Sequence, residues 1–298
     1  MLYEVAIQVL TYNQKDYIAQ CLDSIVMQRT TFPFVAVVYD DASTDGTADI
    51  VRQYTERYPA IIHPIFQTEN QYSKGFSPAK IAAEELDRLN PKYKCFLDGD
   101  DYWMDAESLQ MRYDYLEEHP ACAVVYSKVV KLLPSGEIVD LDAGYKWEVP
   151  TLEQLLMRNT IPFSTAMCRM DVHRAYFKEI KPFDKPWPIL DWAMWLYMVS
   201  KQHEMAFIDQ VTCVYRVTPV SMSRKKTLWK RIKYINGLKH LSLSFSRYST
   251  QPGIRRQIKR RMNRGIYHEI MDEIKKYPVG ALLFKIYMTL QYGKNKTE

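Results

Sequence analysis

The sequence predicts an α/β protein with a mostly parallel central sheet, flanking helices and a basic helical extension at the C-terminus. Three observations support this fold class. Strand-like and helix-like segments alternate over the first hundred residues, which is typical of a parallel sheet covered by helices on both faces. Polar residues stand where three of the predicted strands end. Basic residues are concentrated in the last quarter of the chain.

Four short apolar runs are predicted to be strands of one parallel sheet. They span residues 5–10, 34–39, 61–66 and 94–97. Helices are expected between them because the apolar spacing changes there. Apolar side chains recur at helical spacing within residues 17–26, a second helix is expected from about Asp45 with Ser43 or Thr44 as its cap, and a third is expected over residues 77–89.

The pattern changes after residue 103. A helix is expected over residues 107–118, a strand pair within 121–133 with a turn at 134–136, and helices near 152–157 and 192–199. From about Arg224 the chain is expected to be helical and basic.

The composition is that of an ordinary globular protein, with 298 residues of which 47% are hydrophobic and 25% charged. Its five cysteines stand singly among apolar neighbours, without a CxxC pair, so we expect buried free thiols in a reducing cytoplasm rather than disulfides or a zinc site. The N-terminus lacks the features of a signal peptide, and no stretch reaches the roughly 18–20 apolar residues that span a bilayer. We therefore expect a cytoplasmic protein.

The charge is divided unevenly along the chain. Residues 1–223 carry 21 Lys+Arg and 31 Asp+Glu, whereas residues 224–298 carry 19 and 4. Apolar side chains interleave with the bases of residues 224–264, which suits a helix lying on an anionic membrane surface. A solvated or packing helix is the alternative interpretation. Nothing in the sequence resembles a nucleic-acid-binding module, so no nucleic-acid partner is expected.

The polar residues at the strand ends predict where a ligand binds. Thr11, Asp41 and Asp98 each lie just beyond the carboxyl end of a predicted strand. In open α/β sheets, ligands bind in the crevice at these ends. We expect the three strand ends to form one site.

Residues 96–103 contain three acids, Asp98, Asp100 and Asp101. Carboxylates this close repel one another, and a cation would offset that repulsion. Oxygen ligands suit Mg²⁺ or Mn²⁺, which would bridge to a diphosphate. The alternative is an acidic loop that caps a helix.

Three segments together resemble family 2 glycosyltransferases of the GT-A fold, a Rossmann-like α/β fold. They are VLTYN at 9–13, VVYDDASTDGT at 37–47 and FLDGDDYW at 96–103, and their order and spacing fit the family over roughly residues 3–105. The resemblance implies that residues 1–105 form the nucleotide-sugar-binding half of a GT-A domain and 106–223 its acceptor-binding half. Residues 224–298 would be the basic helical extension.

The resemblance also implies roles for individual residues. The nucleotide site would comprise Thr11, Tyr12, Asn13, Asp40, Asp41, Asp98 and, on a looser match, Lys80. Tyr12 or its neighbours would contact the base, and one acid of the Asp40–Asp41 pair would accept a hydrogen bond from it. Asp100 would ligate the metal directly, and Asp98 would contact the ribose or the metal shell. Lys80 is otherwise a solvated helix charge.

A second block implies an acceptor side. Residues 161–167 resemble the acceptor-side strand of bacterial members, and Asp191 stands where relatives carry the catalytic base. Relatives usually have two acids there, whereas this chain has Leu190 in place of the first; an apolar neighbour would raise the pKa of Asp191 towards a useful value. Asp191 also fits a helix N-cap. The expected acceptor-side residues are Trp103, Ser164, Thr165 and Trp192, and the tryptophans around Asp191 are either core or a stacking platform.

The sequence departs from the family near Arg216. Many relatives carry a histidine close to this position, near the metal or diphosphate, but this chain has none between His203 and His240. Either phosphate and water complete the metal shell, or Arg216 and the bases that follow bind the diphosphate.

We therefore expect a hexosyl- or N-acetylhexosaminyl-transferase. It would move a sugar from a nucleotide-sugar, with a UDP-sugar as the expected donor, to a glycan or lipid-linked acceptor by an inverting single displacement. It would act peripherally at the inner face of the cell membrane. Two alternatives stay open, namely an inactive nucleotide-sugar-binding scaffold and a sugar-nucleotidyltransferase, whose Gly-rich phosphate loop residues 11–14 do not resemble.

Overall fold

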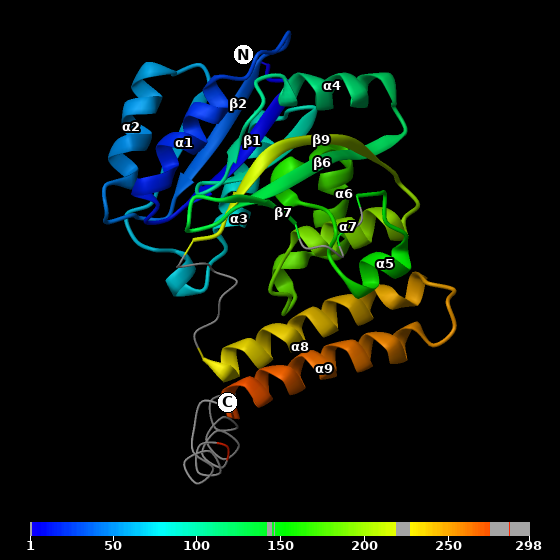
Figure 1. The fold of residues 1–298 in the computed structure, drawn as a ribbon. Helices are drawn as coiled ribbons and strands as arrows, with labels where there is room; N and C mark the ends of the chain where they lie inside the picture. The colour runs from blue at the N-terminus through cyan, green and yellow to red at the C-terminus, as the bar shows by residue number, and fades with distance from the viewer. Residues whose placement is uncertain (1, 142–144, 146, 219–226, 275–285, 287–298) are drawn as a thin grey trace.

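The structure is a computed structural model that describes residues 2–141, 145, 147–218, 227–274 and 286. Within these residues, nine strands form one sheet in the order β3-β2-β1-β4-β8-β6-β9-β5, and β7 pairs with β6. Helices lie against the sheet, and a pair of long helices lies apart from it at the C-terminal end (Figure 1).

The first half of the sheet confirms the expected alternation. Its strands are β1 (Val5–Thr11), β2 (Phe34–Asp40), β3 (Ile62–Phe66) and β4 (Tyr93–Asp98), and its helices are α1 (Lys15–Val26), α2 (Thr47–Arg57) and α3 (Pro78–Leu89). All neighbouring strands among these four are parallel. The β1 side chains alternate between two faces: Ile7 packs in the cluster that contains Leu22 of α1 and Val51 of α2, and Ala6 packs with Leu86 of α3.

The predicted cap of α2 was wrong. Gly46, in the left-handed region at φ 101°, occupies the N-cap position, and neither Ser43 nor Thr44 caps the helix. Asp45 instead accepts the backbone N–H of Thr47 at 2.9 Å. Aspartate therefore satisfies the helix terminus from one residue before the cap.

The second half of the sheet contains antiparallel pairs, so the sheet as a whole is mixed but mostly parallel, as expected. Its strands are β5 (Tyr102–Trp103), β6 (Cys122–Leu132), β7 (Ile138–Asp140), β8 (Met167–Arg169) and β9 (Glu204–Arg216). The short β8 is antiparallel to both β4 and β6, so it joins the two halves. The β6–β9 pair is parallel, with register shifts near Ser127 and Lys128 where the long strands curve (Figure 1).

Further helices cover the second half. They are α4 (Ser108–Glu118), α5 (Leu152–Met157), α6 (Met170–Ile180) and α7 (Asp191–Ser200). Residues 192–198 of α7 are all buried, so α7 lies at the centre of a second hydrophobic core. The segment 161–167, expected to be strand, instead contains a 3-10 turn, Phe163–Thr165, before β8 begins.

The C-terminal extension forms a helical hairpin from α8 (Leu228–Phe245) and α9 (Ile254–Ile274). Leu241, Phe245 and Ile258 belong to the same core cluster as α7, so the hairpin is packed onto the body. Within the described residues, no helix is both long and apolar enough to cross a membrane. Residues 224–226, 275–285 and 287–298 of the expected extension lie outside the described residues. The five cysteines are buried and free, as expected.

Candidate functional site

The structure brings the three polar strand ends together. Thr11 is in register with Asp40, and Leu10 is in register with Asp98. The Thr11 carbonyl accepts the N–H of Asp41 at 3.1 Å. The three strand ends therefore meet at one edge of the sheet, as expected.

The two acids after β2 organise the loops around them. Asp40 is 1% exposed and accepts both the backbone N–H (3.0 Å) and the hydroxyl (2.5 Å) of Ser43. Asp41 is 2% exposed and accepts the backbone N–H groups of Gln71 (2.9 Å) and Tyr72 (3.1 Å) and the Tyr39 hydroxyl (3.0 Å). Each carboxylate therefore fixes a loop at the rim of the site.

The loops after β1 and β2 brace each other. Asn13 donates its backbone N–H to the Ser43 hydroxyl at 2.9 Å and accepts the Thr44 N–H on its side-chain oxygen at 2.8 Å. Asn13 itself lies in the left-handed region at φ 52°, which asparagine adopts more readily than most residues. The adjacent Tyr12 is 47% exposed, so its ring stands open at this rim.

The acids after β4 carry unfavourable charge. Burial, together with the neighbouring Asp100 and Asp191 carboxylates, raises the pKa of Asp98 to about 7. Burial also raises the pKa of Asp100, while hydrogen bonds and the nearby Arg216 oppose that increase. Burial raises the pKa of Asp101 as well, and the neighbouring Asp98 and Asp100 carboxylates raise it further. A cation at this loop would relieve the repulsion.

Arg216, at the end of β9, braces this acidic loop. Its backbone N–H donates to the Asp101 carboxylate at 2.9 Å, and its Nε donates to the Asp100 carbonyl at 2.9 Å. Its guanidinium also donates to Gln20 and lies over the rings of Tyr17 and Tyr102. These contacts turn Arg216 towards the loop backbone.

Gly99 makes the loop fit closely against β1. A Cβ at this position would lie 2.5 Å from Gln14 Oε1 and 2.9 Å from Thr11 Cβ. Thr11 Oγ1 and Gln14 Oε1 are both buried and make no hydrogen bond within the described part of the chain. Two unsatisfied oxygens beside Asp100, which is hydrogen-bonded by Gln14, indicate a place for a polar ligand.

The donor set at this loop fits a cation shared with a ligand. In the ranges described, no three His, Cys, Asp or Glu side chains converge on one point that would hold a metal ion. Mg²⁺ in nucleotide sites is often held by one or two carboxylates, with phosphate and water completing its octahedron. Asp98 and Asp100 would supply two such carboxylates to a divalent ion at this loop.

Asp191 lies within electrostatic reach of this loop, although 93 residues separate it from Asp98 in the sequence. It is the first residue of α7, and Leu190 holds the N-cap position without a side-chain cap. Its carboxylate accepts Nδ2–H of Asn159 at 2.9 Å. Burial raises the pKa of Asp191, and hydrogen bonds from the Trp192 backbone and Asn159 partly offset the increase.

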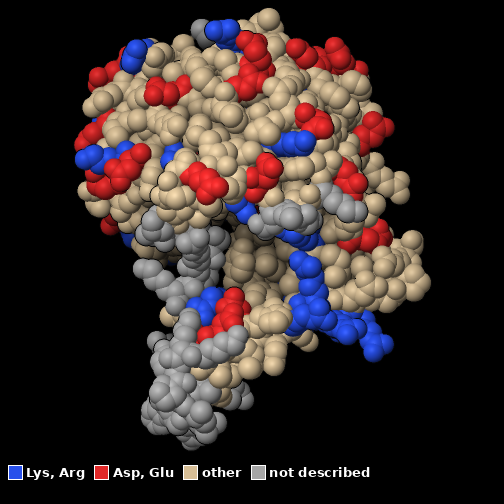
Figure 2. All heavy atoms as spheres, in the orientation of Figure 1, with Lys and Arg blue, Asp and Glu red and all other residues tan. Residues whose placement is uncertain are grey.

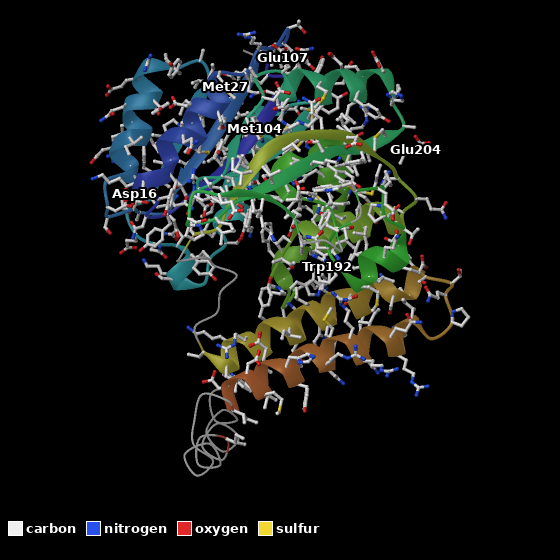
Figure 3. All side chains as sticks on the ribbon, in the orientation of Figure 1. Asp16, Met27, Met104, Glu107, Trp192 and Glu204 are labelled. Atoms are coloured by element: carbon white, nitrogen blue, oxygen red, sulfur yellow. The ribbon has the colours of Figure 1, made fainter. Side chains whose placement is uncertain are left out.

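The four residues expected on the acceptor side are all buried. Trp103 is 1% exposed and donates its indole N–H to the Ser164 carbonyl at 2.8 Å. Thr165 is buried and donates its hydroxyl to Ser127. Trp192 is 3% exposed, donates to the Leu155 carbonyl at 2.8 Å and lies among the packed side chains between the body and α8 (Figure 3). These contacts place both indoles in the packed interior.

Lys80 is exposed and lines a groove between α3 and α6, together with His173 and Phe177. Sequence reasoning missed Asn159 and Gln14. Gln14 directly follows the Thr-Tyr-Asn segment, which is a usable signal, but Asn159 stands in a connection without periodicity.

Comparisons with known proteins agree with this geometry. A family model described as "Glycosyl transferase family 2" matches residues 6–180. An uncharacterised protein of Mycobacterium tuberculosis is 29% identical over 71% of this chain, and the match spans only 58% of that relative's length. TuaG of Bacillus subtilis, whose name assigns it to teichuronic acid biosynthesis, is 27% identical over 77% of this chain and 84% of its own. WfaP of Escherichia coli is 27% identical over 80% and 87%; its name describes a glucosyltransferase that uses UDP-Glc and GlcNAc-diphosphoundecaprenol.

Two solved structures share the fold. TarS of S. aureus (residues 1–349, with UDP) matches with a TM-score of 0.58 and 19% identity, over 87% of this chain and 69% of that one. PcManGT, a mannosyltransferase of Pyrobaculum calidifontis solved with GDP-Man and Mn²⁺, matches with a TM-score of 0.60 and 17% identity, over 97% and 81%. The GT-A-like arrangement expected from the sequence is therefore confirmed.

Proposed function

The chain belongs to glycosyltransferase family 2, and from that premise we propose that it transfers a sugar from a nucleotide-sugar to a glycan or lipid-linked acceptor by a metal-dependent, inverting single displacement. One observation carries the proposal: Asp191, at the start of α7, comes within electrostatic reach of the acidic loop after β4. A base and a diphosphate site must lie close together for a direct displacement between acceptor and donor.

The donor site would lie at the loops after β1 and β2. Tyr12 offers an exposed ring for the base, and Thr11, Asn13, Asp40 and Asp41 build the walls. A UDP-sugar is the donor we favour, since TarS was solved with UDP and with UDP-GlcNAc. A GDP-sugar is the alternative that PcManGT suggests.

Asp100 and Asp98 would hold Mg²⁺ or Mn²⁺, which when bound supplies positive charge for the departing diphosphate. The buried oxygens of Thr11 and Gln14 support a polar ligand at this position. Arg216 keeps the loop in place through the Asp100 carbonyl and the Asp101 carboxylate.

Asp191 would act as the base. The acceptor hydroxyl oxygen attacks the anomeric carbon, the bond from that carbon to the diphosphate oxygen breaks, and Asp191 takes the hydroxyl proton. Inversion follows because the new bond forms opposite the one that breaks. The raised pKa of Asp191, caused by burial, makes it a stronger base than a solvated aspartate, and Asn159 orients its carboxylate.

The outer face of α9 supports docking on an anionic membrane. Its buried residues recur at Ile254, Ile258 and Met262, so the other side of the helix faces water. That exposed side carries the basic face, defined as Arg255, Arg256, Lys259, Arg260 and Arg264. Basic side chains gather at the hairpin in Figure 2, whereas acids and bases are mixed over the body. We propose peripheral binding at the cytoplasmic side of the cell membrane, where a lipid-linked acceptor of the kind in the WfaP name would be reached.

The test of function is a donor screen followed by one substitution. Wild-type protein is titrated with UDP-, GDP- and dTDP-sugars with and without Mn²⁺, and transfer is measured to an N-acetylglucosamine diphosphate that carries a short alkyl chain. We expect Asp191→Asn to bind the donor like wild type and to lose transfer by at least about a hundredfold. Substantial turnover by Asp191→Asn would remove Asp191 as the base. Donor binding without transfer to any acceptor would favour the scaffold alternative.

Membrane docking is tested with vesicles. We expect Arg256→Glu/Arg260→Glu to weaken co-sedimentation with phosphatidylglycerol vesicles roughly tenfold or more, because each base near an anionic surface contributes about 1 kcal/mol. A matched double reversal on the body, Arg57→Glu/Arg88→Glu, changes the net charge equally and should have a small effect. Equal losses in both doubles would mean that net charge, and not this face, governs binding.

A further inference from the structure

The helix α8 is packed directly on the loop that leads to Asp191. Gly237, buried in α8, lies so close to this loop that a Cβ there would be 2.8 Å from Pro188 Cδ and 3.0 Å from the Pro186 carbonyl oxygen. Near the end of the same helix, the Phe245 ring lies 5.8 Å from that of Trp187. The loop before the proposed base is therefore held between α8 and the body.

This packing brings Tyr234 to the site. Residues three apart on a helix share a face, so Tyr234 lies one turn before Gly237 on the side that meets the loop. Tyr234 is half-buried. Its pKa is raised by burial, then by the Asp191 carboxylate and by Tyr215. Tyr234 thus lies within the electrostatic field of the proposed base.

The second tyrosine, Tyr215, belongs to β9. It is the penultimate residue of β9, one position before the Arg216 that braces the acidic loop, and it is 37% exposed. The phenols of β9 and α8 therefore interact electrostatically with each other, and Tyr234 also interacts with Asp191. Figure 2 shows a recess between the body and the hairpin, and α8 forms one side of it.

We propose that Tyr234 and Tyr215 form an aromatic wall that receives the acceptor sugar ring and presents its hydroxyl to Asp191. This inference rests on the proposed function and deepens it, because it assigns part of the acceptor site to the C-terminal hairpin. A pyranose ring presents an apolar face of C–H groups, which an aromatic ring covers well, while the phenol hydroxyls can bond the hydroxyls at its edge. Tyr234 is a specificity residue in this arrangement and takes no proton.

The hairpin then has two functional faces, the inner face of α8 and the basic face of α9. The inner face of α8 orders the acceptor against the base, and Gly237 permits the close approach that this requires. Trp103 and Trp192, whose indoles are buried and hydrogen-bonded to backbone carbonyls, leave the acceptor contact to these more exposed tyrosines.

The experiment compares Tyr234→Ala, Tyr234→Phe and the control Tyr267→Ala, which removes a 57% exposed tyrosine from α9. Each is tested for the dissociation constant of the donor by calorimetry, for melting temperature, and for transfer kinetics with the alkyl diphosphate-linked N-acetylglucosamine as acceptor. We expect Tyr234→Ala to raise the acceptor KM about tenfold, the size of a lost aromatic contact, with the donor dissociation constant within twofold of wild type. Tyr234→Phe should restore most of the loss, since it keeps the ring, and Tyr267→Ala should match wild type.

Three outcomes would overturn the inference. One is an unchanged acceptor KM in Tyr234→Ala. Another is a rise in acceptor KM that comes with lower melting temperature and weaker donor binding, with the same losses in Tyr234→Phe, which would make Tyr234 a packing residue. A wild-type protein that binds donor but transfers to no acceptor in a panel of p-nitrophenyl glycosides and the diphosphate-linked sugar would refute the proposed function and this inference with it. In that case all Tyr234 variants would also bind donor equally.

Discussion

Replacement of Gly237 by alanine tests whether α8 holds the loop before Asp191. The new Cβ would lie 2.8 Å from Pro188 Cδ and 3.0 Å from the Pro186 carbonyl, whereas ordinary contacts are 3.4–4 Å. Neither neighbour is the far end of a flexible side chain, so helix or loop must move. Overpacking of this kind costs about 1–3 kcal/mol, and the better helix propensity of alanine returns about 1 kcal/mol. We expect a net loss of about 1 kcal/mol, or roughly 2–4 °C in Tm.

Gly265→Ala is the matched control. Gly265 lies in α9, and a Cβ there would meet only Ile235 side-chain atoms at 3.8 and 3.9 Å, an ordinary contact. This variant should gain up to about 1 kcal/mol from helix propensity, so the two alanine substitutions should shift Tm in opposite directions. Thermal unfolding followed by circular dichroism measures both.

The same pair of variants also reports on function. Displacement of residues 186–188 moves the start of α7, and a base must be held within about 0.5 Å of its productive position. We expect Gly237→Ala to lose transfer activity roughly tenfold or more while donor affinity stays the same, and Gly265→Ala to keep both. If Gly237→Ala were as stable and as active as Gly265→Ala, the close packing of α8 on the loop would be refuted.

Two further predictions concern buried charges. Asn159→Ala removes a hydrogen bond that favours the ionised form of Asp191, so the pKa of Asp191 should rise. The acid limb of the kcat–pH profile should therefore move to higher pH. An acid limb at the wild-type pH would show that Asn159 does not influence the base. Burial lowers the pKa of Lys94 from 10.5 in the unfolded chain to about 7 in the fold, so between these values the unfolded state binds the extra proton and stability falls as pH decreases. Lys94→Met should therefore raise Tm relative to wild type more at pH 7.5 than at pH 9.5, and a difference independent of pH would contradict a neutral Lys94.

The first half of the fold could be predicted because its signals are local. Apolar runs ending in polar residues define β1, β2 and β4, and parallel pairing then forces Thr11, Asp40 and Asp98 to one edge. The mixed second half could not be predicted in this way. The strand that joins the halves, β8, has only three residues, too few for any periodicity, and its pairing with β4 depends on contacts far apart in sequence.

The site was predictable to the same extent. Asp98, Asp100 and Asp101 could be identified from the sequence because three carboxylates so close together repel one another, and a bound cation would offset that repulsion. The hydrogen bond between Asn159 and Asp191 spans 32 residues and has no pattern in the sequence. Such partners are found only once the fold is known.

The C-terminal hairpin is helical and basic as expected, but it is also packed onto the body. Its acids are few, and two of them, Glu269 and Glu273, pair with Arg231 of α8 at 2.6 and 2.8 Å. That pairing neutralises charge between the helices, whereas the basic face on the outer side of α9 has no acids among its residues. Apolar residues of both helices meanwhile join the core around α7. One two-helix unit therefore joins a basic outer surface to the loop that carries Asp191, and if the basic face docks on a membrane, the same contact brings the acceptor side of the site to the lipid surface.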